Sequence, residues 1–181
     1  LYLAYFMTIK TIFLDRDGVI NKEVNYLHKI EDFEFIDGVF DTCQYFKSLN
    51  YKIIITTNQS GISRGYYTEI DFQKLTNWML GQFNINNIDI LDVIHCPHLP
   101  SDLCDCRKPK PGMFLAAKIK HNIDMKNSWM IGDQENDIKA ANNAGIMNTI
   151  LVKSGHNVDE FNSNAKFILD SIKNIHQAIK N

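Results

Sequence analysis

Residues 12–21 read IFLDRDGVIN, and this stretch decides how the whole chain is interpreted. An apolar run typical of a buried strand stops at Asp15, and a second carboxylate, Asp17, soon follows with a glycine behind it. Asp17-Gly18 alone is also an ordinary turn sequence. The two carboxylates indicate a functional site only if other strand ends bring polar side chains to the same place.

A parallel α/β fold is predicted because short apolar runs alternate with amphipathic segments. The expected strands are 8–14, 51–57, 88–96, 128–132, 148–152 and 167–169. The expected helices are 38–49 after Asp37, 68–83 with a Thr68/Asp71 capping box, 111–121, one ending at Ala144 before Gly145, and a last one capped by Ser171. The predicted fold class is a Rossmann-like parallel sheet with helices on both faces and no large cap domain.

Length and composition restrict the possible functions. The 181 residues suit one domain, so we expect residues 7–181 to form it, with residues 1–6 as an N-terminal extension. A net charge of −2 argues against nucleic acid or an anionic membrane as the main partner. The apolar start is too short to span a membrane and has no basic residue before it, as a signal peptide would. We therefore expect a cytoplasmic protein that acts as a monomer.

Polar residues follow three of the predicted strands. They are Asp15 with Asp17, then Thr57-Asn58-Gln59, and then Asp133 behind Gly132. In parallel sheets, ligands bind at the carboxyl ends of strands, near the point where the strand order reverses. These strand ends are therefore expected to meet, which makes the simple turn interpretation of Asp15 and Asp17 much the weaker one.

Paired carboxylates at such a place suit phosphoryl transfer. A carboxylate is ionised at neutral pH and can act as a nucleophile without an adjacent base. The negative charge of a phosphoryl group opposes its approach by roughly 4 kcal/mol at about 4 Å and an effective dielectric of about 20. A divalent cation has to offset this repulsion, and Mg²⁺ suits carboxylate and phosphate oxygens. Asp17 could protonate the leaving alcohol and then deprotonate water.

The segment CPHLPSDLCDCRKPKPG carries four potential zinc ligands, which are Cys96, His98, Cys104 and Cys106. Three thiolates and an imidazole form a permitted tetrahedral set, although the one-residue spacing is less usual than CxxC. A disulfide does not suit a cytoplasmic protein, and free buried thiols leave His98 unexplained. Zinc in the loop 96–106 would be structural and would fix Arg107 and Lys108 behind it. Cys43, on the apolar face of a helix, is expected in the core.

These motifs together resemble the haloacid dehalogenase (HAD) superfamily, over nearly the whole chain from Met7. FLDRDGVIN is similar to its first motif, Thr57 after YKIIIT to its second, Lys108 to its third, and Asp133 in GDQEND to its fourth. Within the superfamily, an aspartate at the second acidic position marks phosphatases and mutases. The resemblance therefore implies a phosphatase.

The resemblance also implies roles for these residues. Asp15 would be the nucleophile and Asp17 the general acid/base. Mg²⁺ would be held by Asp15, the backbone carbonyl of Asp17, and Asp133. Thr57 and Lys108 would bind the oxygens of the transferring phosphoryl group, which is the electrostatic work that such transfer chiefly needs.

Two families of zinc-loop phosphatases within the superfamily compete for the substrate. The compact cysteine loop looks more like that of histidinol-phosphate phosphatases. TNQSGISRGYYTE, YLHKIEDFEFIDGV and KPGM look more like the family that removes the 7-phosphate of D-glycero-D-manno-heptose 1,7-bisphosphate. The expected function is therefore Mg²⁺-dependent hydrolysis of that 7-phosphate through an aspartyl-phosphate, in nucleotide-activated heptose synthesis for surface polysaccharide. A non-catalytic, zinc-stabilised binding module is the alternative outside enzymes.

The same resemblance implies a substrate site with a basic residue at the distal phosphate. Its expected members are Glu23, Val24, Asn25, Tyr26, Thr57, Asn58, Gln59, Ser60, Arg107 and Lys108. A guanidinium fork pairs well with phosphate oxygens, so Arg107 is the main candidate, with Arg64 as another. Either could instead be a solvated loop cation.

Three further positions carry open expectations. The family commonly has a basic residue directly after Asp133, where this chain has Gln134, which removes one positive charge near the phosphate. Asp137 either supports the site from behind or is an exposed helical carboxylate. His156 is expected to be a surface or loop residue without a chemical role.

Overall fold

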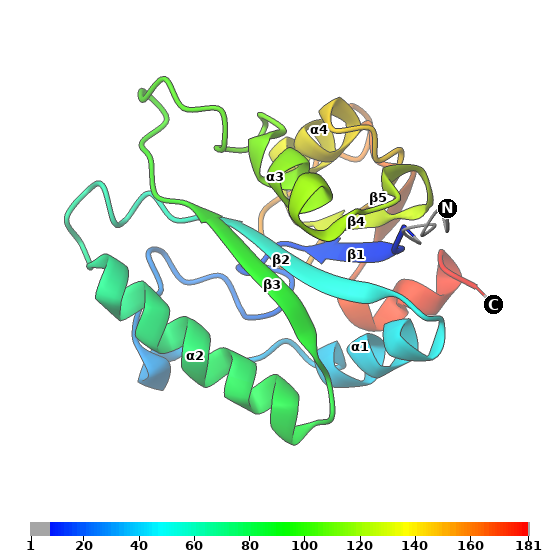
Figure 1. The fold of residues 1–181 in the computed structure, drawn as a ribbon, viewed down its shortest axis with the longest axis horizontal. Coiled ribbons are helices and arrows are strands. Elements are labelled where there is room, and N and C mark those ends of the chain that lie inside the picture. The colour runs from blue at the N-terminus through cyan, green and yellow to red at the C-terminus, as the bar shows by residue number, and fades with distance from the viewer. Residues whose placement is uncertain (1–7, 181) are drawn as a thin grey trace, which may run out of the picture.

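Among residues 8–180, which this computed structural model describes, six parallel strands form one sheet in the order β3-β2-β1-β4-β5-β6 (Figure 1). The strands are β1 Thr11–Leu14, β2 Lys52–Asn58, β3 Ile90–Cys96, β4 Trp129–Gly132, β5 Asn148–Val152 and β6 Phe167–Leu169. The chain moves outward from β1 to one edge and then returns to build the other half from β4. The order therefore reverses between β1 and β4, which is where such sheets bind ligands.

Helices cover both faces of the sheet, as the alternating pattern predicts. They are α1 Val39–Ser48, α2 Glu69–Ile85, α3 Gly112–His121 and α4 Glu135–Asn143, with 3-10 turns at η1 Ile30–Asp32, η2 Met125–Asn127 and η3 Ile172–Gln177. Figure 1 shows α1 and α2 on one side and α3 and α4 on the other. No helix within residues 8–180 is long and apolar enough to cross a membrane.

Strand β1 shows why both faces need helices. Successive strand side chains point to opposite faces, so a strand buried on both sides is apolar throughout. Ile12 and Leu14 belong to the core that includes α1 and α2, whereas Phe13 belongs to the core beneath α3 and α4. Phe13 packs there against Phe114, with ring centroids 5.0 Å apart. Cys43 lies in the first core, as expected.

The helix boundaries follow local chemistry. Thr68 and Asp71 form the expected capping box, in which Asp71 N–H donates to Thr68 Oγ1 at 3.2 Å and Thr68 N–H donates to Asp71 Oδ2 at 2.8 Å. Gly145 follows α4 with a φ of +93°, a left-handed conformation that suits glycine. Both expectations are confirmed, and they fix the loops that enter and leave the sheet.

Three expectations about the elements are wrong in detail. β1 begins at Thr11 rather than residue 8, and β3 begins at Ile90 rather than residue 88. The last helix is the 3-10 turn η3, and the Ser171 side chain makes no capping hydrogen bond. Its six residues are too few for an independent α-helix, and they bury Ile172 and Ile175 at the three-residue period of a 3-10 turn. The expected extension at residues 1–6 lies outside the described residues.

Candidate active site

The polar strand ends converge as predicted. Asp15 follows β1 directly, Thr57 and Asn58 are the last residues of β2, and all three line one pocket together with Lys108. Asp133, directly after β4, brings a carboxylate oxygen within 4.8 Å of one from Asp15. The sheet therefore gathers side chains that lie far apart in the sequence.

Lys108 is the buried cation at the centre of this site. Its Nζ lies 3.0 Å from Asp15 Oδ1 and 2.6 Å from Asp137 Oδ1, and it donates to the Thr56 carbonyl at 2.9 Å. Burial alone would lower the pKa of Lys108, but the charges of Asp137 and Asp15 outweigh it and raise that pKa. The lysine therefore keeps its positive charge.

Asp137 supports the site from behind. Its side chain is buried, so the alternative of an exposed helical carboxylate is wrong. Besides the ion pair with Lys108, Asp137 Oδ2 accepts the Gln134 N–H at 3.0 Å and so caps α4. One carboxylate thereby fixes both the lysine and the start of a helix.

The buried carboxylates carry more negative charge than Lys108 can balance. Asp15, Asp133 and Asp137 offer oxygens that all lie within 4.8 Å of one another. Burial and the neighbouring charge of Asp137 raise the pKa of Asp15, against the opposing effect of Lys108, and the same two causes raise the pKa of Asp133. Asp133 Oδ1 is buried without a hydrogen-bond partner. An all-oxygen cluster with an unpaired buried oxygen fits Mg²⁺.

Two glycines make room for Asp133. A Cβ at Gly18, where φ is +80°, would lie 2.2 Å from Asp133 Oδ2, and a Cβ at Gly155 would lie 2.0 Å from the same atom. Neither distance is possible for a real side chain. Gly18, in the first motif, therefore leaves the space that the carboxylate of Asp133, in the fourth motif, occupies.

Asp17 is held by donors that the sequence analysis did not identify. Arg16 donates to Asp17 Oδ1 from Nε at 3.2 Å and from Nη2 at 3.0 Å, and Asn21 Nδ2 donates to the same oxygen at 2.9 Å. The Arg16 side chain is buried and also donates to the Leu27 carbonyl at 3.1 Å. The sequence carried a signal for these contacts. An arginine between two aspartates directly after a buried strand needs acceptors for its N–H groups.

His156 lies in an exposed loop, as expected, but it contacts the site. Its Nδ1 lies 2.6 Å from Asp133 Oδ2, and its backbone N–H donates to the same oxygen at 3.1 Å. Burial would lower the pKa of His156, but the hydrogen bond and charge of Asp133 raise it overall. His156 Nε2 lies 3.5 Å from Gln134 Nε2. The imidazole therefore places a basic group beside Gln134, the position at which the family commonly has a basic residue.

The residues expected to bind the substrate lie around one pocket. The pocket is lined by Glu23, Val24, Asn25, Tyr26, Thr57, Asn58, Gln59, Ser60, Arg107 and Lys108, all of them expected there. Burial and the charge of Asp17 raise the pKa of Glu23 to about 6. Arg107 donates from Nη1 to the His98 carbonyl at 3.2 Å. Arg64 instead lies over the Tyr26 ring, 5.9 Å from its centroid.

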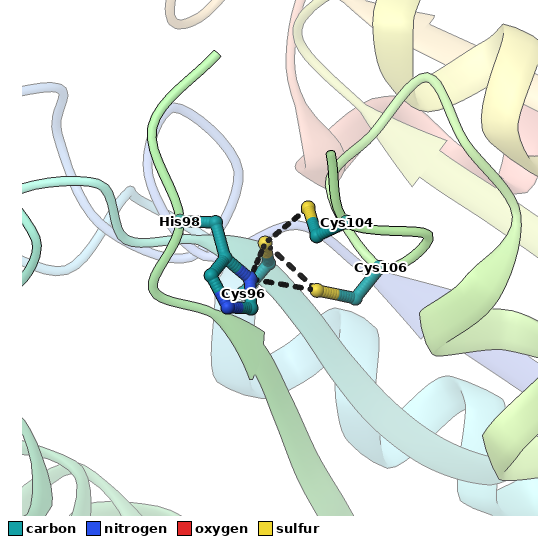
Figure 2. Close-up of side chains that lie close together, drawn as sticks. All are labelled: Cys96, His98, Cys104 and Cys106. Atoms are coloured by element: carbon teal, nitrogen blue, oxygen red, sulfur yellow. Dashed lines mark hydrogen bonds between the residues drawn. The ribbon is translucent and has the colours of Figure 1, made fainter. Parts of the chain in front are cut away.

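Cys96, His98, Cys104 and Cys106 converge at the end of β3 (Figure 2). The Sγ atoms of Cys96 and Cys104 are 3.8 Å apart, and His98 Nδ1 lies 3.5 Å from Cys96 Sγ and 3.2 Å from Cys106 Sγ. Two sulfurs on a tetrahedral zinc would be about 3.8 Å apart, which the Cys96–Cys104 pair matches, whereas the Cys96 and Cys106 Sγ atoms lie closer, at 3.0 Å. The set of three thiols and one imidazole fits that ion. The structure joins none of the four cysteines in a disulfide.

The loop behind this cluster is tied to β2. Asn58 Nδ2 donates to the Lys108 carbonyl at 3.2 Å, and Asn58 Oδ1 accepts the Lys108 N–H at 3.1 Å. His95 points elsewhere, because its Nε2 lies 3.0 Å from Glu69 Oε1 and its ring packs on Phe72. The two hydrogen bonds from Asn58 therefore fix the Lys108 backbone, and the cysteine cluster lies directly before it in the chain.

Comparison with known proteins first defines the class. Residues 105–175 match the family model described as HAD-hydrolase-like. A crystal structure of D,D-heptose 1,7-bisphosphate phosphatase from B. bronchiseptica, complexed with magnesium and phosphate, shares the fold with a TM-score of 0.82 and 24% identity, over 93% of this chain and 97% of that one. The fold is that of a HAD-like protein.

Curated relatives then define the family. D-glycero-alpha-D-manno-heptose-1,7-bisphosphate 7-phosphatase from Campylobacter jejuni is 52% identical over 92% of this chain and 98% of the relative. The alpha enzyme from Photorhabdus laumondii is 50% identical over 87% of this chain and 90% of the relative. The D-glycero-beta-D-manno-heptose-1,7-bisphosphate 7-phosphatase from Escherichia coli K12 is 41% identical over 96% and 95%. The chain belongs to this family of phosphoric monoester hydrolases.

Proposed function

We propose that this protein removes the 7-phosphate of D-glycero-D-manno-heptose 1,7-bisphosphate through an aspartyl-phosphate on Asp15. The observation that carries the proposal is the ion pair of Lys108 with Asp15 at 3.0 Å, beside Asp17, which lines the same pocket and is held by Asn21. A binding module would not need an acid/base beside a nucleophile. The family membership supports the same activity and the same substrate class.

In the first half of the reaction, an Asp15 carboxylate oxygen attacks phosphorus. The bond from phosphorus to the C7 oxygen breaks, its electron pair stays on that oxygen, and Asp17 delivers a proton to it. Thr57 and Lys108 hold the phosphoryl oxygens, where negative charge is greatest during transfer. The sugar then leaves as an alcohol.

In the second half, Asp17 takes a proton from water. The water oxygen attacks phosphorus of the acyl phosphate, and the bond from phosphorus to the Asp15 oxygen breaks, with its electron pair returning to the carboxylate. Atoms and charges balance, and Asp17 is protonated again for the next cycle. Asp15 and Asp17 thus act on the two sides of one phosphorus atom.

Two groups of side chains would each hold a metal ion. Asp15, Asp133 and the backbone carbonyl of Asp17 would hold Mg²⁺, which would offset the negative charge of the phosphoryl group and the carboxylates. Cys96, His98, Cys104 and Cys106 would hold a structural zinc ion that fixes the loop before Arg107 and Lys108. Arg107 would then bind the distal phosphate.

The relatives also favour one anomer. The two relatives at 50% and 52% identity are named for the alpha bisphosphate, whereas the relative at 41% is named for the beta bisphosphate. We infer that the alpha anomer is preferred. The product of the reaction would enter nucleotide-activated heptose synthesis for surface polysaccharide. The reaction would take place in the cytoplasm.

Phosphate release tests the proposal directly. The purified protein is assayed with Mg²⁺ against the alpha and beta heptose 1,7-bisphosphates and histidinol phosphate at equal concentrations. We expect the highest kcat/KM with the alpha bisphosphate. Preference for histidinol phosphate would overturn the substrate and leave the mechanism, whereas no release from any phosphate ester would favour the binding module.

A further inference from the structure

We propose that Tyr67 and Gln59 are positioning residues that orient the proton-carrying oxygen of Asp17, an inference that rests on the acid/base role proposed above. Neither residue needs to touch the reacting atoms for this. The argument starts from the two oxygens of Asp17, which have unequal surroundings.

Asp17 Oδ1 is fully engaged by donors. It accepts from Arg16 Nε at 3.2 Å, from Arg16 Nη2 at 3.0 Å and from Asn21 Nδ2 at 2.9 Å. An oxygen that already accepts these hydrogen bonds has no lone pair left for a proton. The proton that reaches the leaving group must therefore sit on Oδ2.

Gln59 is the donor that meets Oδ2. Its Nε2 lies 3.1 Å from Asp17 Oδ2 and 2.8 Å from Thr57 Oγ1. A carboxylate only accepts hydrogen bonds, so the Gln59 atom facing it must be the NH₂ group, and its two hydrogens serve these two acceptors. Because Thr57 accepts from Gln59, its own hydroxyl hydrogen stays available for a phosphoryl oxygen.

Tyr67 fixes which way the Gln59 amide faces. Its hydroxyl donates to Gln59 Oε1 at 2.5 Å, which leaves Nε2 pointing at Asp17. Burial raises the pKa of Tyr67 to about 12, so the hydroxyl remains a donor at neutral pH. The Tyr67 ring stacks on His28 at a centroid distance of 5.1 Å and an interplanar angle of 8°, which holds the hydroxyl in place.

Gln59 lines the pocket, as expected of a substrate-binding residue, and its contacts also indicate an indirect role. Gln59 is 3% exposed and Tyr67 is 5% exposed, and both polar ends of the Gln59 amide have protein partners. A group so engaged does not gain by binding a sugar hydroxyl. Its effect on the reaction passes through Asp17 and Thr57.

Leaving-group dependence separates this role from a structural one. Protonation by Asp17 matters for a sugar alcohol, which is a poor leaving group, and matters much less for p-nitrophenolate, which leaves unprotonated. The experiment measures kcat/KM with heptose 1,7-bisphosphate, or another primary sugar phosphate that the protein turns over, and with p-nitrophenyl phosphate. Tyr67→Phe removes only the hydroxyl and keeps the stacked ring.

We expect Tyr67→Phe to lower kcat/KM about tenfold for the sugar phosphate and less than about threefold for p-nitrophenyl phosphate, because general acid catalysis contributes on the order of 10²–10⁴. Gln59→Leu should lower kcat/KM for both substrates, and the loss for the sugar phosphate should exceed the loss for p-nitrophenyl phosphate by more than in Tyr67→Phe. Thr57→Ala, which loses a phosphoryl contact, should lower both values equally. Tyr45→Phe is the matched control, because it removes a tyrosine hydrogen bond to the Ile179 carbonyl far from the site.

The reference for the acid/base itself is Asp17→Asn. Asp17→Asn should lower kcat/KM more for the sugar phosphate than for p-nitrophenyl phosphate. If it does so while Tyr67→Phe and Gln59→Leu lower kcat/KM equally for both substrates, or not at all, the positioning role is wrong and the proposed function stands. If Asp17→Asn itself shows no selective loss, the acid/base assignment and this inference both fail. Selective loss in all three variants, with Tyr45→Phe unchanged, supports the relay.

Discussion

The two clusters of potential metal ligands in this protein are built in opposite ways. The carboxylates Asp15, Asp133 and Asp137 come from β1, β4 and α4, and the sheet brings them together. The thiol and imidazole cluster comes from Cys96, the last residue of β3, and from the loop that follows it (Figure 2). The first cluster is therefore positioned by the fold itself, whereas the second lies within one short segment of chain, which a metal ion would hold together. Lys108 joins them, because it follows the loop and ends between Asp15 and Asp137.

The largest effect is expected from Asp15→Asn. It removes the nucleophile from the fold-positioned cluster, and phosphate release should fall by more than about three orders of magnitude because the remaining groups cannot replace the covalent step. Bound zinc, measured by metal analysis, should not change. Asp89→Asn, at an exposed carboxylate, is the matched control. Turnover within a few-fold of the parent would mean that another residue attacks phosphorus.

Lys108→Met tests the residue that links the two clusters. We expect kcat/KM to fall by about 10²–10³, because a preorganised cation is lost from the phosphoryl group. The free energy of unfolding should fall by about 3 kcal/mol, since Asp15 and Asp137 lose their buried counter-charge. Chemical denaturation and phosphate release are measured beside Lys118→Met, an exposed lysine on α3. A stable variant with unchanged activity would show that the carboxylates balance their charge without the lysine.

Cys104→Ser tests whether the loop depends on its ion. Zinc content should fall from about one equivalent to none, and kcat/KM should fall about tenfold, because a shift of Lys108 by a fraction of an ångström is costly. Far-ultraviolet circular dichroism should stay unchanged, since the sheet does not use the loop. Cys43→Ser, in the helical core, should keep its zinc even if it unfolds more easily. Full activity without zinc would show that the active site does not depend on the cysteine cluster.

Gly155→Ala should have the smallest effect. The added Cβ would meet Asp133 Oδ2 at 2.0 Å, so the loop must shift and the carboxylate must turn. We expect the Mg²⁺ concentration for half-maximal activity to rise about five- to tenfold, as when a supporting contact of a metal ligand is disturbed. Gly81→Ala on α2, where a Cβ meets nothing within 4 Å, should leave it unchanged. An unaltered Mg²⁺ dependence in Gly155→Ala would argue against Asp133 as a ligand.

The sequence predicted the fold and the convergence of the polar strand ends because both depend on local patterns. Alternating apolar runs define the parallel sheet, and topology then requires Asp15, Thr57 and Asp133 to meet. The convergence of Cys96, His98, Cys104 and Cys106 was predictable because these residues lie in one short segment of the sequence. Boundaries such as the start of β1 and the 3-10 turn η3 were missed, since they depend on pairing and packing rather than on composition.

Contacts across the fold were harder to predict. Nothing near His156 in the sequence indicates that its imidazole reaches Asp133, because that contact joins the loop after β5 to the end of β4. The same holds for Tyr67, which reaches Gln59 through a turn before α2. Side-chain partners of this kind follow from three-dimensional packing, which one sequence does not fix.

Trapping the phosphorylated enzyme tests the central claim most directly. The protein is mixed with substrate and Mg²⁺, quenched in acid within the first turnover and treated with borohydride, which reduces an acyl phosphate but not a free carboxylate. Peptide mass spectrometry then examines position 15. The account predicts a phosphoryl group on Asp15 before reduction and the corresponding alcohol after it, only when substrate is present. Phosphate released in that same turnover with an unmodified Asp15 at every quench time would contradict it.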